Sequence, residues 1–173
     1  DKWGRQMSDA GIFEPQLIAQ MIEWRRDFHR HPELGFAEER TAARVAALLE
    51  SFGLEVHRSI GNTGVVGILQ RGNGPGSIAF RADMDALPIT ETGTAKWAST
   101  NDGVMHACGH DGHTSMLLGA ACHLAAQDDF NGRIIFIFQP NEEHGLGARA
   151  MIDDGLFARF PADAVFAMHN IPG

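Results

Sequence analysis

Hydrophobic residues recur every three to four positions in three stretches of the chain, which is the spacing of amphipathic helices. The first stretch runs from Pro15 to Arg30, and its proline suits the first turn of a helix. The second begins near residue 37 and ends at Gly53, with Glu38 and Glu39 placed to favour its positive N-terminal end. The third covers about residues 112–127. We therefore expect three long helices.

Shorter apolar runs between turn-forming residues predict strands. Five such runs lie at residues 55–58, 64–71, 77–82, 133–138 and 164–168, and one more short helix is expected at about 146–153. The run IIFIF is apolar at every position, which is typical of a strand covered on both faces. Helices and strands alternate after residue 110, and that order favours parallel neighbours. Residues 90–106 lack periodicity and are expected to form a long loop.

The pattern therefore predicts an α/β fold, with a mixed, largely parallel sheet flanked by helices. A chain of 173 residues is long enough for one domain with a hydrophobic core. Residues 1–14 are expected to be a tag remnant or a flexible N-terminus, which leaves 15–173 as the folded part.

Charge and cysteine content exclude several classes of function. The chain has 14 Lys and Arg against 22 Asp and Glu, a net charge of −8, so it would repel nucleic acid. No apolar run is long enough to span a membrane, and the N-terminus shows no secretory signal pattern. Cys108 and Cys122 do not make a disulfide scaffold, and Cys122 lies among apolar helix residues. We expect a reducing, cytoplasmic setting.

Polar residues of the metal-binding types follow three of the predicted strands. Ligand sites of open α/β sheets lie at the carboxyl ends of strands, so these residues should share one edge. The loop before the third long helix contributes to the same edge. Asp, Glu, His and Cys together are a set of metal ligands. The set comprises Asp83, Asp85, His106, Cys108, His110, Asp111, Glu142, Glu143 and His169.

Each of these residues also has an ordinary structural explanation. The Glu142–Glu143 pair could belong to a solvated loop, since Glu is usually exposed. A lone His169 is more often a structural histidine than a ligand, and Cys108 could be a small buried hydrophobe. His29 and His31 are expected to bond locally around the end of the first helix. The convergence of several candidates, rather than any one of them, favours a metal site.

Five motifs follow one another along the chain. They are HRHPELGFAEERTA, FRADMDALPI, MHACGHDGHTSMLLGAA, FIFQPNEEHGLGARAMIDDGLF and AMHNIPG. With these motifs the chain resembles the amidohydrolase branch of the M20 metallopeptidases, which includes hippurate hydrolases, N-acyl-amino-acid amidohydrolases and indole-acetyl-amino-acid hydrolases. The likeness covers nearly the whole chain after Pro15.

The resemblance implies a dinuclear zinc-peptidase-like catalytic domain that binds two divalent metal ions, among Mn, Zn, Co and Ni. It implies that Glu142 is the general base and that Asp85 stands behind a ligand. Asp83 occupies the place of a metal-binding His in other branches, and His144 stands where a small residue is common. His144 is favoured as a loop side chain. The implied metal ligands are Cys108, His110, Glu143 and His169.

The implied reaction is hydrolysis of the amide bond of an N-acyl amino acid, hippurate-like, or of a small peptide by metal-activated water. The family carries a further His ligand downstream and a lid and dimerisation domain, neither of which lies within 15–173. We therefore expect this range to be the N-terminal part of a truncated catalytic domain, from a protein that could form a homo-oligomer.

Two alternatives remain at this point. A cysteine hydrolase would use Cys108 with His106 or His110, and it would leave the acidic pair and His169 without a role. A catalytically incomplete fragment, or a non-catalytic protein of the same fold, would bind metal or substrate without turnover.

Overall fold

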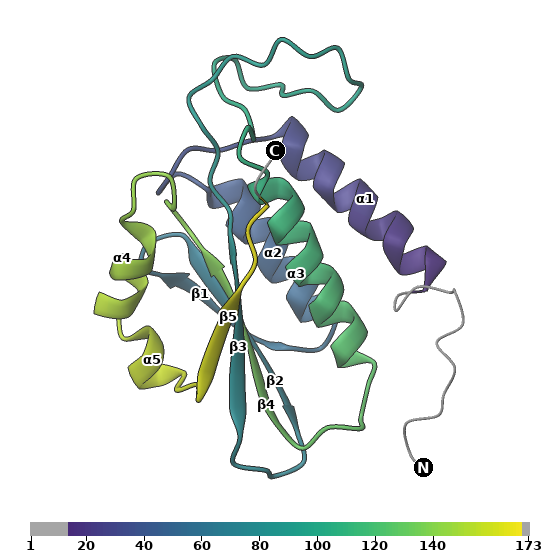
Figure 1. Cartoon of the computed structure of the whole chain (residues 1–173), viewed down its shortest axis with the longest axis vertical. Coiled ribbons are helices and arrows are strands. Elements are labelled where there is room, and N and C mark those ends of the chain that lie inside the picture. Colours follow the sequence, from purple (N-terminus) through teal and green to yellow (C-terminus); the bar gives the residue numbers. More distant parts are fainter. Residues whose placement is uncertain (1–13, 171–173) are drawn as a thin grey trace.

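A five-stranded sheet forms the centre of the computed structural model, which describes residues 14–170 (Figure 1). The strands lie in the order β1-β2-β4-β3-β5, and β3 pairs in parallel with both β4 and β5. β2 pairs antiparallel with β1 and β4, so it alone runs against the other four. The predicted mixed, largely parallel sheet is confirmed. The strands are β1 (Glu55–Ile60), β2 (Gly64–Arg71), β3 (Ser77–Asp83), β4 (Gly132–Gln139) and β5 (Ala164–Ala167).

Helices cover both faces of this sheet (Figure 1). The three long helices pack on one face and the two short ones on the other. No helix of residues 14–170 is both long enough and apolar enough to cross a membrane. The helices are α1 (Pro15–Arg30), α2 (Glu39–Ser51), α3 (His110–Ala125), α4 (Gly147–Asp153) and α5 (Leu156–Arg159).

The apolar run in β4 explains the two-layered core. Ile134, Phe136 and Phe138 pack with α1, α2 and α3, whereas Ile135 and Ile137 pack with α4 and α5. This alternation follows from the twofold period of side chains along a strand. Because both faces are covered, every position of the run is apolar, as the sequence predicts.

Most element boundaries agree with the sequence prediction to within two residues. α3 begins at His110 because Gly109, with φ +93°, adopts the left-handed conformation that ends the preceding loop. The single turn α5 has no counterpart among the predicted elements, since four residues are too few to show a helical period. Residues 90–106 form the expected long loop. An isolated antiparallel β-bridge between Leu87 and Met105 joins its two ends. The proposed flexible N-terminus, 1–14, lies outside the described residues except for Glu14.

Candidate metal centre

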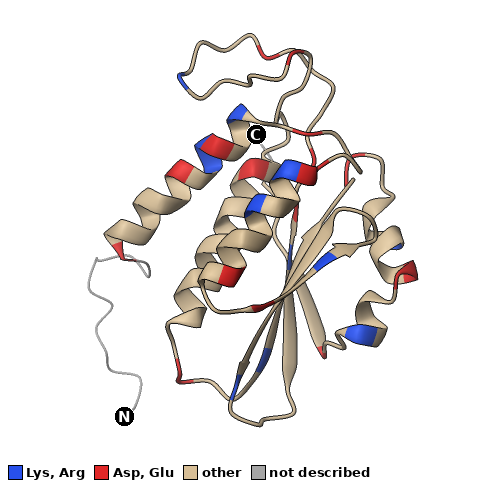
Figure 2. Cartoon of the chain, turned by 180° about the vertical axis from the view of Figure 1, so that it is seen from behind, with Lys and Arg blue, Asp and Glu red and all other residues tan. Residues whose placement is uncertain are grey.

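The polar residues selected from the sequence meet at one end of the sheet. β3, β4 and β5 run in the same direction and end there, and α3 begins there. Figure 2 shows acidic residues in the loops at this end, whereas the sheet itself carries few charged positions. The topology thus brings together segments that lie up to 86 positions apart in the sequence, from Asp83 to His169.

Two overlapping groups of donor atoms form the centre of this cluster. Donor atoms of Cys108, His110 and Glu143 all lie within 4.8 Å of one another. Donor atoms of Asp83, His110, His113 and His169 form a second such group, so His110 belongs to both. Cys108 Sγ lies 3.5 Å from His169 Nε2, which connects the groups a second time. The structure therefore places all four candidate ligands in one cluster.

The acidic pair lies directly beside His110. Its Nε2 is 3.6 Å from Glu142 Oε2 and 3.7 Å from Glu143 Oε1. Glu142 keeps about a third of its side chain exposed (34%), whereas Glu143 is more buried (17%). The two neighbours are therefore placed differently: Glu143 points into the cluster, and Glu142 lies at its solvent side.

Two buried acceptors in the cluster lack a protein partner. His110 Nε2 and Glu143 Oε1 are inaccessible to solvent and have no hydrogen bond within the described residues. An unpaired buried polar group costs about 1–3 kcal/mol, so such atoms point to a ligand. A thiolate, imidazoles and a carboxylate suit a divalent transition-metal ion. The residues present therefore fit the metal ions that the resemblance implies.

His110 is oriented by its other ring nitrogen. Nδ1 lies 2.8 Å from the backbone carbonyl oxygen of Asp85, which can only accept a hydrogen bond. Nδ1 therefore carries a proton, and the Nε2 lone pair faces the acidic pair when the ring is neutral. Burial lowers the pKa of His110, but the Asp85 carboxylate, whose Oδ1 lies 3.3 Å from Nδ1, and the nearby Asp83 charge outweigh it, so the pKa is raised.

The turn that carries the acidic pair is held from behind by buried carboxylates. Asp85, 1% exposed, accepts the backbone N–H of Glu142 on Oδ1 and that of Glu143 on Oδ2, each at 3.0 Å. Burial alone would raise the pKa of Asp85, but hydrogen bonds with His110 and these two N–H groups lower it. Glu38 Oε1 accepts the preceding N–H, from Asn141, at 2.8 Å. Asp85 thus contacts both His110 and the turn that carries the acidic pair.

Glu38 stands at the N-terminal end of α2, as the sequence predicts, but it also has contacts that the sequence does not indicate. Its side chain is fully buried, and Oε2 accepts a hydrogen bond from Thr63 Oγ1 at 2.5 Å. Burial raises the pKa of Glu38. The prediction considered only the helix dipole. The partners of Glu38 lie 25 and 103 positions away in the sequence, and no local pattern predicts such distant contacts.

The prediction of local bonding holds for His31 but is wrong for His29. His31 Nδ1 bonds the backbone oxygen of Asp27 one helical turn earlier, at 2.8 Å. His29 instead bonds Asp111 Oδ2 through Nδ1 at 2.8 Å and Glu91 Oε1 through Nε2 at 3.2 Å. The hydrogen bond with Asp111 is the main cause that raises the pKa of His29. These contacts tie the long loop and the start of α3 to α1.

Three further residues take positions that the sequence left open. Asp83 is fully buried and pairs with Arg81 Nη1 at 2.8 Å. His144 Nδ1 lies 2.6 Å from Asn141 Oδ1, so its ring bonds within its own loop. His106 is buried, and neither of its ring nitrogens has a partner within the described residues. Burial lowers the pKa of His106 to about 4.

The geometry gives little support to a cysteine nucleophile. Burial, and then the charge of Glu143, raise the pKa of Cys108 to about 11, so the thiol alone is protonated at neutral pH. Reactive cysteines lie in electropositive surroundings that lower the thiol pKa, and Cys108 lies beside two carboxylates. A bound cation would favour the thiolate. Cys108 therefore fits a ligand better than a nucleophile.

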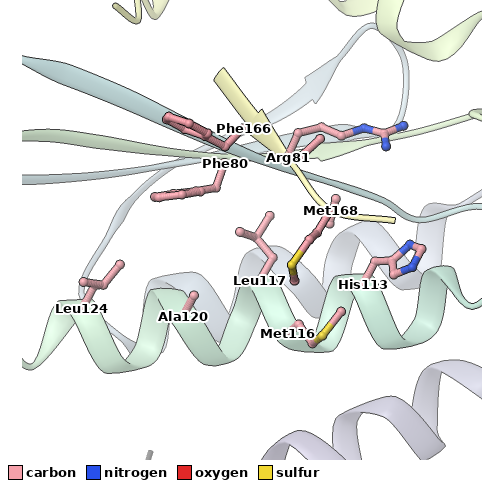
Figure 3. A pocket seen from close by; sticks show the side chains of 11 residues that line it. Phe80, Arg81, His113, Met116, Leu117, Ala120, Leu124, Phe166 and Met168 are labelled. Carbon is pink, nitrogen blue, oxygen red and sulfur yellow. The ribbon is translucent and has the colours of Figure 1, made fainter. Parts of the chain in front are cut away.

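An apolar cavity of about 420 Å³ lies next to the cluster, between α3 and the β3–β5 edge of the sheet (Figure 3). Phe80, Leu117 and Phe166 are among the side chains that line it. His113 and Met168 stand at the end nearest the cluster (Figure 3). Because few polar groups converge on it, this cavity does not form a reaction site by itself.

Comparisons with known proteins identify relatives of this chain. The family model of the peptidase family M20/M25/M40 matches residues 79–173. A hippurate hydrolase of Campylobacter jejuni is 54% identical over 156 residues, which cover 90% of this chain and 40% of that protein. An N-acyl-L-amino acid amidohydrolase of Geobacillus stearothermophilus is 50% identical over 145 residues, covering 82% of this chain and 39% of that protein.

Solved structures show the same likeness. A Bacillus subtilis protein described as a dinuclear metal-binding peptidase of the M20 family superposes with a TM-score of 0.86 at 40% identity, covering 92% of this chain and 45% of that one. An aminobenzoyl-glutamate utilization protein of Klebsiella pneumoniae gives a TM-score of 0.71 at 31% identity, covering 91% and 45%. The chain spans about two fifths of the length of the curated relatives it matches.

Proposed function

The chain belongs to the peptidase family M20/M25/M40, and from that premise we propose that its protein is a metal-dependent amidohydrolase. The proposed reaction is cleavage of the amide bond of N-acyl amino acids, hippurate-like, or of small peptides. Two relatives with about half of their aligned residues identical bear the names hippurate hydrolase and N-acyl-L-amino acid amidohydrolase. These names support the substrate class.

One observation carries the proposal: His110 Nε2 and Glu143 Oε1 are buried in the cluster and have no hydrogen-bond partner among the described residues, as expected where a metal ion binds. The proposed ligands of two divalent cations, Mn, Zn, Co or Ni, are Cys108, His110, Glu143 and His169. Such cations, when bound, polarise the scissile carbonyl and lower the pKa of water. The thiolate sulfur of Cys108 favours zinc, whereas the carboxylate and imidazoles also suit the other three.

Glu142 is the proposed general base. It lies at the rim of the cluster, where its carboxylate can take a proton from the attacking water and pass it to the departing amine. Asp85 holds the backbone N–H groups of Glu142 and Glu143 at 3.0 Å, so it fixes where both carboxylates project. Asp85 thereby acts through its neighbours rather than on the substrate.

The chain covers 40% and 39% of the two named relatives, which supports an activity that belongs to a larger protein. We infer that residues 15–173 form the N-terminal part of the catalytic domain and that the rest of the protein supplies a further ligand, a lid and a surface for homo-oligomers. A cytoplasmic location fits an enzyme that acts on free amino-acid derivatives. It also fits Cys108, which must stay reduced to bind metal.

Replacement of Glu142 by Gln tests the proposal. In the full-length protein with Mn²⁺, we expect hydrolysis of N-benzoylglycine and N-acetyl amino acids to fall by roughly 10²–10⁴-fold, the usual contribution of a general base. Metal content should stay unchanged, because Glu142 is not a proposed ligand. Glu50→Gln is the matched control, since Glu50 pairs with Arg58 on the protein surface. Activity of Glu142→Gln at the wild-type level would refute the assignment.

The rival function is metal or substrate binding without turnover. It predicts that the wild-type full-length protein binds Mn²⁺ but hydrolyses none of these substrates.

A further inference from the structure

His113 has no role in the proposed reaction, yet it is buried beside the candidate ligands. It lies one turn after His110 on α3, so the two side chains share a face of the helix. Its ring centroid is 5.5 Å from that of His110 and 4.7 Å from that of His169. Only 3% of the residue is exposed. Figure 3 shows its ring at the end of α3 that faces the cluster.

Both ring nitrogens of His113 already have protein partners. Nδ1 lies 2.7 Å from Asp83 Oδ1. Nε2 lies 3.0 Å from the backbone nitrogen of Asn170 and 2.9 Å from its Oδ1. No lone pair is left for a cation. His110 differs, because its Nε2 has no partner within the described residues.

Asp83 is a fixed support for this ring. Its second oxygen pairs with Arg81 Nη1 at 2.8 Å, and its backbone oxygen accepts a hydrogen bond from Thr114 Oγ1 at 2.8 Å. Asp83 is the last residue of β3, and Thr114 lies on α3. The position of His113 is therefore set by a strand and a helix. A ring held in this way can in turn fix a more exposed segment.

The segment that follows β5 carries His169 and requires support from outside the sheet. β5 is only four residues long and ends at Ala167, so the sheet does not hold His169 or Asn170. Asn170 lies against Gly109, where an added Cβ would come within 2.8 Å of Asn170 Oδ1. The backbone N–H of Asn170 donates a hydrogen bond to His113 Nε2 at 3.0 Å, and this bond secures Asn170 in this position.

Asn170 in turn orients the ring of His169. His169 Nδ1 lies 2.7 Å from the backbone oxygen of Asn170, so Nδ1 carries the proton. The lone pair of Nε2 then faces Cys108 Sγ, 3.5 Å away, when the ring is neutral. A shift of the Asn170 backbone would turn this donor atom away from the cluster.

We propose that His113 is a positioning residue, which anchors Asn170 to Asp83 and thereby aims His169 Nε2 into the metal centre. The inference rests on the proposed function, because it assigns His113 to the support of a proposed ligand. The rival interpretation is that His113 is itself a ligand, since its donor atoms lie within 4.8 Å of those of Asp83, His110 and His169. Because both ring nitrogens of His113 already have protein partners, the structure favours the positioning role over the ligand role.

Titration with Co²⁺ distinguishes these roles without measuring activity. The metal-free full-length protein is titrated with Co²⁺ alone, and absorption reports both stoichiometry and the thiolate–cobalt band of Cys108. His113→Ala removes the anchor. Asn170→Ala removes the side-chain contact but keeps the backbone N–H, and Asn170 is exposed, so this variant should fold even if His113→Ala does not. His57→Ala is the matched control, because His57 pairs with Glu55 on β1.

We expect His113→Ala to bind two Co²⁺ ions at saturation, with one of them weakened by roughly 10–100-fold, as is usual for residues that orient ligands. Asn170→Ala should weaken the same ion by a smaller factor, with an altered thiolate–cobalt band, and His57→Ala should match the wild type. If His113→Ala and Asn170→Ala both bind Co²⁺ with wild-type affinity, this inference is overturned but the proposed function is not. Loss of one Co²⁺ equivalent at saturation in His113→Ala would identify a ligand and also overturn it. Wild-type protein that binds no Co²⁺ would refute the proposed function and this inference together.

Discussion

Asp85→Asn should detach the acidic pair from its support while preserving the size of the side chain. Asp85 uses both of its oxygens, one for the N–H of Glu142 and the other for the N–H of Glu143. An asparagine has a single oxygen. Its NH₂ group must therefore face one of these two backbone donors, and that N–H is left without an acceptor.

The cost follows from these contacts. A hydrogen bond to a charged group contributes about 1.5–3 kcal/mol, and the bond that survives becomes a weaker neutral one. Together these losses amount to about 2–4 kcal/mol of the free energy of unfolding. That is a large fraction of the roughly 5–15 kcal/mol that stabilises a typical domain. The turn should also loosen, and the Co²⁺ affinity should fall by roughly 10–100-fold, because Glu143 is a proposed ligand.

Denaturant unfolding of the metal-free protein measures the first effect, and Co²⁺ titration measures the second. Asp154→Asn is the matched control. Asp154 Oδ2 accepts the N–H of Gly61 at 2.9 Å, and an asparagine oxygen can keep that bond. We expect a change below about 1 kcal/mol in the control, with Co²⁺ affinity unchanged. The reasoning is refuted if Asp85→Asn is as stable as Asp154→Asn and binds Co²⁺ equally well.

Two further predictions concern a buried carboxyl and the thiol. Burial raises the pKa of Glu38, so the folded state binds this proton more tightly than the unfolded state, and stability from this group is lost as pH rises through the folded pKa. Glu38→Gln cannot titrate, so its free energy of unfolding minus that of the wild type should increase as pH rises above the usual Glu pKa of about 4.3, and a constant difference would contradict the assignment. Cys108→Ala should lower the metal content measured by elemental analysis, because it removes a proposed ligand; unchanged stoichiometry would exclude Cys108 from the ligand set.

The sequence predicts what depends on local periodicity and on the ends of strands. The run IIFIF predicts a strand covered on both faces, and the structure confirms it. The polar residues after β3, β4 and β5 lie close together, because parallel strands share one direction and end at the same edge of the sheet.

The supporting residues could not be predicted in the same way. Glu38 bonds Asn141 across 103 positions, and His29 bonds Asp111 across 82. His113 sits within a recognised motif, but its partner Asn170 is 57 positions away. Such contacts depend on how helices pack over the sheet, which periodicity does not specify. Their only signal in the sequence is a polar residue on the buried face of a helix.

Anomalous diffraction from crystals of the full-length protein grown with Zn²⁺ or Mn²⁺ tests most directly whether this edge of the sheet is a metal centre. We predict two anomalous peaks, with Cys108, His110, Glu143 and His169 supplying the bonds from this part of the chain and Glu142 left free beside them. Peaks at other places, or a cluster that stays empty at saturating metal, would contradict that prediction.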